Sequence, residues 1–414
     1  MPQTLDIQLQ NRYPSEEVYA YITGLALNNN NRVFLLRADG KTPYYPDSPP
    51  HTVHPLSADC AIELGKQGST TIATIPLLAG GRIWFSIGKK LEFFVNPGPA
   101  LVEPSVTNPS DHNINSNWAF CEFTFNQTQI YANISYVDFV SLPISMKLIP
   151  ENGRPQEIHG LKADGLETIC EGLKAQSQID GAGWDKLVVE SDGRKLRVLS
   201  PNHEPGFDGY YESYVNEVWD KYTHTPLIVD TQAEWGKVEG RVGNGQLTFP
   251  GLATFPKPST ADIFSCSSGP FSNNAGPTGP LTARISAAFN RSTLLSNNHQ
   301  PHKERVSEFY RHKVSNHYAR LVHEANHHGR GYAFPYDDVS SGMETDQSGF
   351  KLSAYQHEAD STFGSPSKLL AKFAGPALDL AENNGLATNS ETVSPHHEQR
   401  QRSAVIKVEK NSTS

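Results

Sequence analysis

Two acidic side chains stand out in this sequence because each is the single charge in a long run with strand-like composition. Glu122 is the only charged residue in WAFCEFTFN at 118–126, and Asp138 is the only one in YANISYVDFVSLP at 131–143. The link between the runs, residues 127–130, is short enough for a hairpin. A protonated carboxyl paired with an ionised one can cleave a glycosidic bond, so this pair is a candidate for sugar hydrolysis.

The first of these runs also offers a surface suited to sugar. Side chains alternate across a strand, so every second residue of the run faces the same way. That face holds aromatic, acidic and hydrogen-bonding side chains, namely Trp118, Phe120, Glu122, Thr124 and Asn126. Sugar rings stack on aromatics and sugar hydroxyls bond to the polar groups.

The register of the hairpin decides whether the two acids can cooperate. If Asn126 opposes Tyr131, then Ser135 opposes Glu122 and Asp138 lies about 10 Å further along the strand. Side-chain rotation then brings the carboxyls towards the roughly 6.5–9.5 Å of inverting glycosidases. Because Ser135 and Asp138 have opposite parity, this prediction requires a bulge, or a bend at Asp138. The competing interpretation is that both are ordinary strand acids facing water.

A second motif offers different chemistry. His323-Glu324-Ala325-Asn326-His327 matches His-Glu-x-x-His, which on a helix places two histidines on one face to hold zinc, with the glutamate as base. The motif is short, its neighbourhood is rich in histidine and no third ligand is marked. Gly329-Arg330-Gly331 follows and predicts the end of a helix. The function that this motif would imply is a zinc metalloprotease. An ordinary solvated helix end is the simpler interpretation, so we expect no metal and no other cofactor.

The elements that must position these residues change along the chain. Residues 5–148 contain short alternating runs punctuated by turn residues, which predicts a sandwich or barrel. Helical periodicity then alternates with short strands over about 160–325, and a run of strand and loop follows at 329–339. We expect a β domain at 1–158 carrying the hairpin, a mixed α/β domain at 159–326, and a return to the β domain at 327–351. Residues 352–414 are polar and aperiodic, which predicts a mostly disordered tail, with a possible short helix at 368–373.

Composition narrows the class of protein. Of 414 residues, 37% are apolar and 19% charged, and the net charge of −9 argues against nucleic acid or anionic membranes as partners. No apolar run is long enough for a membrane helix, and residues 1–17 do not resemble a signal peptide. The four cysteines are scattered, which favours buried thiols over a disulfide framework. We expect a monomer.

Longer blocks resemble a known family. The run 81–148, together with DGKTPYYP at 39–46 and GRGYAFPYDDV at 329–339, is similar to the body of glycoside hydrolase family 64. The resemblance covers about residues 5–350. It implies a thaumatin-like β domain and a mixed α/β domain that flank a wide groove. It further implies an inverting β-1,3-glucanase whose partner is β-1,3-glucan polysaccharide.

The resemblance also assigns roles to residues. The acid of the family is the glutamate of Glu-Phe-Thr-x-Asn, here Glu122, and the base is the aspartate sixteen positions on, here Asp138. The threonine and asparagine of that motif contact sugar, which implies Thr124 and Asn126 as binding residues. An aromatic and a hydroxyl residue line the groove on the second strand, and Tyr131 and Ser135 stand at those places.

The chain departs from the family in two respects. Family members continue into closing β-strands where this chain becomes polar, and they are usually secreted whereas no signal peptide is visible here, which leaves the localisation open. A thaumatin-like glucan-binding protein without catalysis is therefore a further alternative.

Overall fold

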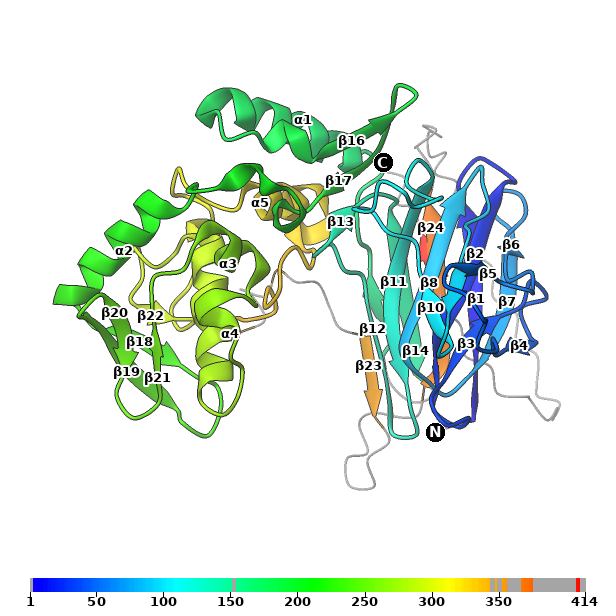
Figure 1. The fold of residues 1–414 in the computed structure, drawn as a ribbon, viewed down its shortest axis with the longest axis horizontal. Helices are drawn as coiled ribbons and strands as arrows, with labels where there is room; N and C mark the ends of the chain where they lie inside the picture. The colour runs from blue at the N-terminus through cyan, green and yellow to red at the C-terminus, as the bar shows by residue number, and fades with distance from the viewer. Residues whose placement is uncertain are drawn as a thin grey trace, which may run out of the picture.

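The computed structural model describes residues 3–150, 154–342, 347, 352–355, 366–374 and 407–409. Figure 1 shows two parts side by side: a β sandwich, and an α/β part that joins it through a small layer of strands and helices. Within the described residues, no helix has the length and apolar character needed to cross a membrane. All four cysteines are buried free thiols, as the sequence analysis favoured.

The first sheet of the sandwich has the strand order β15-β14-β24-β1-β7, and β25 pairs with β24. Its strands are β1 (Thr4–Arg12), β7 (Thr70–Pro76), β14 (Ile144–Pro150), β15 (Gln156–Ile158), β24 (Pro366–Ala374) and β25 (Lys407–Glu409). Leu5, Ile7 and Leu9 of β1 are fully buried and alternate with partly exposed polar residues. The alternation expected from the sequence is therefore confirmed, and it turns one face of this sheet to the core.

The second sheet has the order β23-β12-β11-β8-β2-β3-β4, and β6 pairs with β2. Its strands are β2 (Val18–Ala26), β3 (Arg32–Leu36), β4 (Pro43–Tyr44), β6 (Ile62–Glu63), β8 (Leu78–Ile87), β11 (Asn117–Phe125), β12 (Gln129–Asn133) and β23 (Leu352–Tyr355). A small sheet beside it contains β5 (His54–Pro55), β9 (Phe94–Asn96) and β10 (Ala100–Val102). Of the predicted sandwich or barrel, the sandwich is confirmed, because the described strands form two open sheets and no closed barrel.

The α/β part is built on a five-stranded sheet of order β21-β20-β19-β18-β22. Its strands are β18 (Leu227–Asp230), β19 (Lys237–Gly243), β20 (Gln246–Phe249), β21 (Ala253–Phe255) and β22 (His299–Gln300), and its helices are α2 (Glu212–His224), α3 (Thr260–Ser265) and α4 (Thr278–Arg291). Helix α2 buries Tyr214, Val215, Val218, Trp219 and Tyr222, which share one helical face. The mixed architecture expected for this region is confirmed.

The joining layer comprises β13, β16 and β17 with α1 and α5. Its bounds are β13 (Phe139–Val140), β16 (Val188–Ser191), β17 (Arg194–Leu199), α1 (Gly165–Asp180) and α5 (His317–Ala325). In the part of the chain that the structure describes, six 3-10 turns complete the regular structure, at Trp184–Leu187, Pro201–His203, Pro205–Phe207, Gly269–Phe271, Val306–Glu308 and His327–Gly329.

The expectation of a disordered tail at 352–414 is wrong for three segments. Strand β24 lies inside the first sheet, parallel to β1 and antiparallel to β14, and β25 pairs with it. Strand β23 pairs with β12. The short helix suggested at 368–373 is thus a strand: its lysines, leucines and alanine favour helix, but pairing with two partner strands overrides that weak preference. The rest of 356–414 lies outside the described residues.

Candidate active site

The two candidate strands form the hairpin β11–β12, with a register two residues away from the one expected. Thr124 opposes Tyr131 and Glu122 opposes Asn133, so the prediction that Asn126 opposes Tyr131 is wrong. The cause is a tighter turn, in which the Asn126 N–H donates to the Gln129 carbonyl at 3.0 Å. A two-residue shift keeps every side chain on its predicted face.

The outward face of β11 is the one expected from the alternation. Cys121, Phe123 and Phe125 are buried in the main core, whereas Glu122 and Thr124 are half-buried on the opposite face. The aromatic members of that face, Trp118 and Phe120, belong to a separate cluster, in which the Phe120 ring lies 4.9 Å from the Trp84 ring of β8. The acid therefore stands beside an aromatic patch on the strand that carries it.

Glu122, Thr124 and Tyr131 line one pocket of about 430 Å³. The other residues around it are Gly80, Gly81, Arg82, Glu103, Phe123 and Asn133. Opposite Thr124, strand β8 has a bulge in which Ala79 and Gly80 face a single residue, and Gly80 has φ of 55°. Bulges of this kind bend a strand and are frequent at functional sites.

The nearest charge to Glu122 comes from β8. Arg82 is its cross-strand neighbour, and the Nε and Nη2 atoms of Arg82 each lie 3.3 Å from Glu122 Oε1. The same guanidinium donates through Nη1 to Glu103 Oε2. Arg82 is also 4.7 Å from the centre of the Phe120 ring, which packs against the charged group from one side.

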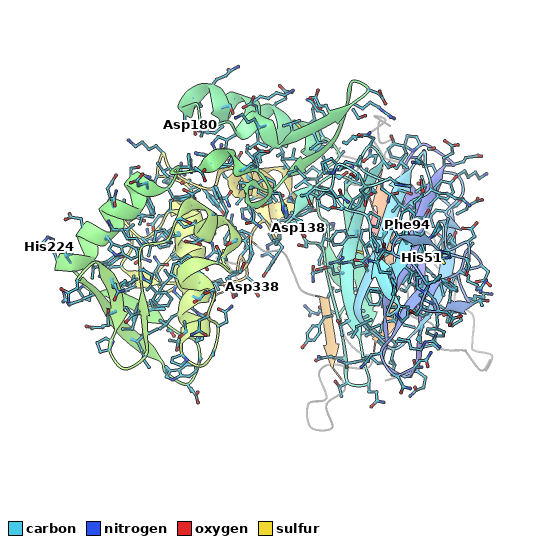
Figure 2. The ribbon with its side chains drawn as sticks, viewed as in Figure 1. His51, Phe94, Asp138, Asp180, His224 and Asp338 are labelled. Atoms are coloured by element: carbon cyan, nitrogen blue, oxygen red, sulfur yellow. The ribbon has the colours of Figure 1, made fainter. Side chains whose placement is uncertain are left out.

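Asp138 lies at a bend just before β13, the geometry that the hairpin prediction required. Its carbonyl accepts the Ser200 N–H at 2.8 Å, and its Oδ1 is 3.0 Å from His203 Nε2. The Tyr318 hydroxyl of α5 donates to the Tyr136 carbonyl at 2.5 Å, two residues before the acid. Asp138 is thus held by the joining layer, where the two parts meet (Figure 2), and its side chain is 52% exposed.

Two predicted binding residues and Asp138 are not among the residues that line the Glu122 pocket. The Oδ1 of Asn126 accepts hydrogen bonds within its own turn, from Thr128 N and Oγ1 and from Gln129 N, at 2.9–3.0 Å. Ser135 forms a parallel bridge with Tyr332, and its Oγ accepts the Val137 N–H at 3.3 Å. The structure therefore gives both residues backbone contacts, and their contact with sugar stays a prediction.

A second pocket, of about 360 Å³, adjoins the first through Asn133 and lies between the sandwich and the segment after α5. Residues of β15 and its end line one side, including Glu157 and His159. His327, His328 and Tyr332 line the other. A cavity therefore lies where the sandwich faces the segment that follows α5.

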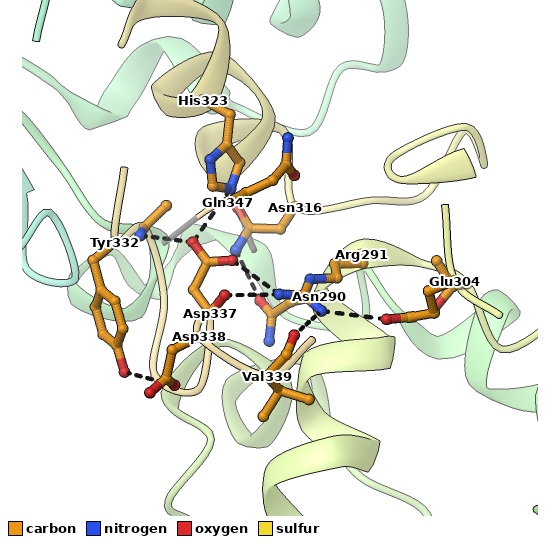
Figure 3. Close-up of polar contacts among 12 residues, drawn as sticks. Asn290, Arg291, Glu304, Asn316, His323, Tyr332, Asp337, Asp338, Val339 and Gln347 are labelled. Atoms are coloured by element: carbon orange, nitrogen blue, oxygen red, sulfur yellow. Dashed lines mark hydrogen bonds and ion pairs between the residues drawn. The ribbon is translucent and has the colours of Figure 1, made fainter. Parts of the chain in front are cut away.

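The segment after this pocket is fixed to the α/β part by a buried charge network (Figure 3). Arg291, the last residue of α4, donates to the Val339 and Asp337 carbonyls at 2.6 and 2.8 Å, and its guanidinium lies 3.3–3.4 Å from the Asp337 and Glu304 carboxylates. All three charged side chains are at most 1% exposed. Burial by itself raises the pKa of Asp337, but the charges of His323 and Arg291, together with hydrogen bonds from His323 and the Ala333 N–H, outweigh it and leave that pKa lowered. Asp337 thus has a structural role, because it fixes the segment after α5 to the end of α4.

Comparison with known proteins decides the family. The family model for the β-1,3-glucanases of glycoside hydrolase family 64 matches residues 3–357. The chain belongs to this family. It is similar to the glucan endo-1,3-β-glucosidase of Cellulosimicrobium cellulans, with 32% identity over 300 residues, covering 68% of this chain and 52% of that protein. The glucan endo-1,3-β-glucosidase of Arthrobacter sp. strain YCWD3 is 31% identical with the same coverage. The chain spans about half the length of these curated relatives.

Solved structures of family 64 give the same fold. A laminaripentaose-producing β-1,3-glucanase in complex with laminaritetraose superposes with a TM-score of 0.78 at 30% identity, covering 91% of this chain and 99% of that one. A β-1,3-glucanase domain from Clostridium beijerinckii has a TM-score of 0.64 at 20% identity over 90% of this chain and 98% of that one, which bears on the fold alone. The resemblance stated from the sequence is confirmed.

The His-Glu-x-x-His alternative requires both of its histidines on one helical face, and this member of family 64 does not place them there. Helix α5 ends at Ala325, so His327 lies in the following 3-10 turn and not one turn along the same helical face from His323. His323 is buried and pairs through Nε2 with Asp337 Oδ2 at 3.2 Å. Among the described residues no three histidine, cysteine or acidic side chains are grouped as metal ligands would be.

Sequence reasoning missed three polar residues around the acids, namely Arg82, Glu103 and His203. Each reaches its partner across a long separation in the chain, from 21 residues between Arg82 and Glu103 to 65 between Asp138 and His203. The one available signal was Arg82, a lone charge at the start of the mostly apolar run 82–87. Such a charge on a buried strand predicts an acidic partner on a neighbouring strand.

Proposed function

We propose that the protein is an inverting endo-β-1,3-glucanase in which Glu122 is the general acid and Asp138 the general base. One observation carries the assignment: the family's acid position lies in a 430 Å³ pocket that Thr124 and Tyr131 also line. Two relatives named as glucan endo-1,3-β-glucosidases and a related enzyme solved with laminaritetraose support the substrate class.

The proposed reaction is a direct displacement. Glu122 donates a proton to the glycosidic oxygen while Asp138 removes one from the water that attacks the anomeric carbon, so the bond breaks with inversion. The half-buried position of Glu122 and the exposed position of Asp138 suit these roles, because water must reach the base. Thr124 and Tyr131 bind the sugar beside the acid, and Asn126 and Ser135 extend the binding strip along the hairpin and the chain after it.

Hydrolysis of linear β-1,3-glucan by wild type, Glu122→Gln and Asp138→Asn tests the proposal. Each substitution is expected to lower kcat by about 10²–10⁴-fold, the usual worth of a general acid or base. Glu217→Gln and Asp220→Asn are matched controls, because both residues are exposed on α2. EDTA is expected to leave the wild-type rate unchanged. Glucan binding without hydrolysis by wild type would instead support a non-catalytic glucan-binding protein.

Two further measurements test the finer parts of the proposal. The first-formed product should be the α-anomer by proton NMR, since inversion at a β-linkage gives α; an initial β-anomer would refute the inverting mechanism. Light scattering during gel filtration should give a mass near the 45.6 kDa of one chain, and about twice that mass would refute the proposed monomer.

A further inference from the structure

The most informative unassigned group at the site is Glu103, which shares Arg82 with the proposed acid. Its Oε2 accepts from Arg82 Nη1, and its Oε1 accepts from Thr23 Oγ1 at 3.2 Å. Glu122, by contrast, is approached by Arg82 only at 3.3 Å, through two contacts to the single atom Oε1. All three ionisable side chains are about one-third exposed, at 32% for Arg82, 29% for Glu103 and 36% for Glu122.

The trio contains two carboxyls and one cation. Glu103 accepts hydrogen bonds at both oxygens, which is the pattern of an ionised carboxylate. Its charge balances the guanidinium of Arg82. With Glu122 protonated the trio is neutral, and with Glu122 ionised it carries one negative charge. Without Glu103 the guanidinium would be unopposed and would favour ionised Glu122, because a cation this close favours the charged form of a carboxyl.

A buried support holds Glu103 in place. The Trp84 indole N–H donates to Thr23 Oγ1 at 3.1 Å, so the Thr23 hydroxyl proton is directed to Glu103. Trp84 and Thr23 are each 1% exposed. Arg82 is a cross-strand neighbour of both Thr23 and Glu122. The three strands β2, β8 and β11 therefore fix the support, the cation and the acid in one row.

We propose that Glu103 is a positioning residue for catalysis: it binds Arg82 and takes up its charge, which leaves the proton on Glu122. The inference rests on the proposed function of Glu122 as general acid. Glu103 itself transfers no proton to the substrate, and its effect passes through Arg82.

The test compares pH–activity profiles of Glu103→Gln, Glu103→Asp and Arg82→Gln on linear β-1,3-glucan. In Glu103→Gln the unopposed Arg82 favours ionised Glu122, so the alkaline limb of the kcat profile moves to lower pH by about one unit, a tenfold loss above the limb. Glu103→Asp keeps the charge and should return the limb most of the way. Arg82→Gln removes the cation and should move the limb the other way. Glu92→Gln, which breaks an exposed pair with His112, is the matched control.

The outcomes separate the inference from the proposed function. A lower kcat in Glu103→Gln with an unmoved alkaline limb, or no recovery in Glu103→Asp, would overturn the inference and leave a structural role. Full activity in Glu122→Gln would overturn the function instead. Carbon-13 NMR of glutamate carboxyls reads the proton directly, and the Glu122 signal is identified as the one that Glu122→Gln lacks. This signal should convert to that of the ionised form at lower pH in Glu103→Gln than in wild type, whether or not glucan is cleaved. Identical conversions would refute the inference.

Discussion

Replacing Arg291 by methionine should destabilise the α/β part more than any surface substitution. Methionine fills a similar volume but leaves the Asp337 and Glu304 carboxylates without their cation, and both are at most 1% exposed. Breaking a buried ion pair by removing one partner costs about 3–5 kcal/mol. The Val339 and Asp337 carbonyls also lose the donors that Arg291 supplies. Because burial raises the pKa of Glu304, protonation of that residue relieves part of the cost. A loss of about 5 kcal/mol is therefore expected, out of the 5–15 kcal/mol typical of a whole domain.

Hydrogen exchange read by mass spectrometry is the suitable assay, because it reports each segment separately. Protection of α4 and of residues 330–342 should fall by about three to four orders of magnitude, at 1.4 kcal/mol per factor of ten, while protection of β1 and β2 should change little. Arg320→Met is the matched control, since it breaks an i,i+4 pair with the half-exposed Glu324 that is worth about 0.5 kcal/mol. If Arg291→Met lost no more protection than Arg320→Met, the buried network would not be what fixes this segment.

Three further substitutions test individual contacts. His203→Ala should lower kcat about tenfold with little change in KM, because it frees the proposed base Asp138 without removing it. This loss is smaller than the one expected for Asp138→Asn. Steady-state kinetics measure it, and an unchanged kcat would exclude a positioning role for His203. Asn126→Asp keeps the turn acceptor but loses the amide donor, so KM should rise while the melting temperature holds, and an unchanged KM would assign Asn126 to the turn alone. Burial, aided by nearby cationic groups, lowers the pKa of His327 from 6.5 to about 4. The unfolded chain thus takes up a proton at higher pH than the folded one, so the stability contributed by neutral His327 is present above pH 6.5 and lost towards pH 4. His327→Gln should flatten melting temperature against pH in that window, and an equal slope in both proteins would contradict this.

The hairpin was predictable because its signals are local. Strand period fixes which side chains share a face, and Glu122 and Thr124 lie together as the alternation required. The register was two residues off because the turn is tighter than expected: the side chain of Asn126 accepts the Thr128 and Gln129 N–H groups and closes a two-residue loop. Asparagine side chains often accept hydrogen bonds from the backbone two residues on. Reading Asn126 as such a turn residue would have predicted the two-residue loop and with it the observed register.

The strands at the end of the chain were not predictable in the same way. Strand β24 is stabilised by pairing with β1 and β14, which lie far from it in the sequence, and its own residues favour helix. The side chains that contact the two acids were equally unpredictable, because they too come from distant parts of the sequence. Glu103 and His203 reach Arg82 and Asp138 from separate elements, and nothing in the neighbouring sequence marks them. Contacts of this kind follow from the packing of whole sheets and layers.

The two proposed catalytic carboxyls are held by different parts of the molecule. Glu122 belongs to the sandwich, where β8 and β11 set its position against Arg82. Asp138 belongs to the joining layer, where Ser200 and His203 bind it and the Tyr318 hydroxyl binds the chain just before it. Their separation is therefore fixed by how that layer packs on the sandwich rather than by the hairpin alone. Since displacement by water depends on that separation, the joining layer contributes to catalysis without providing a reacting group.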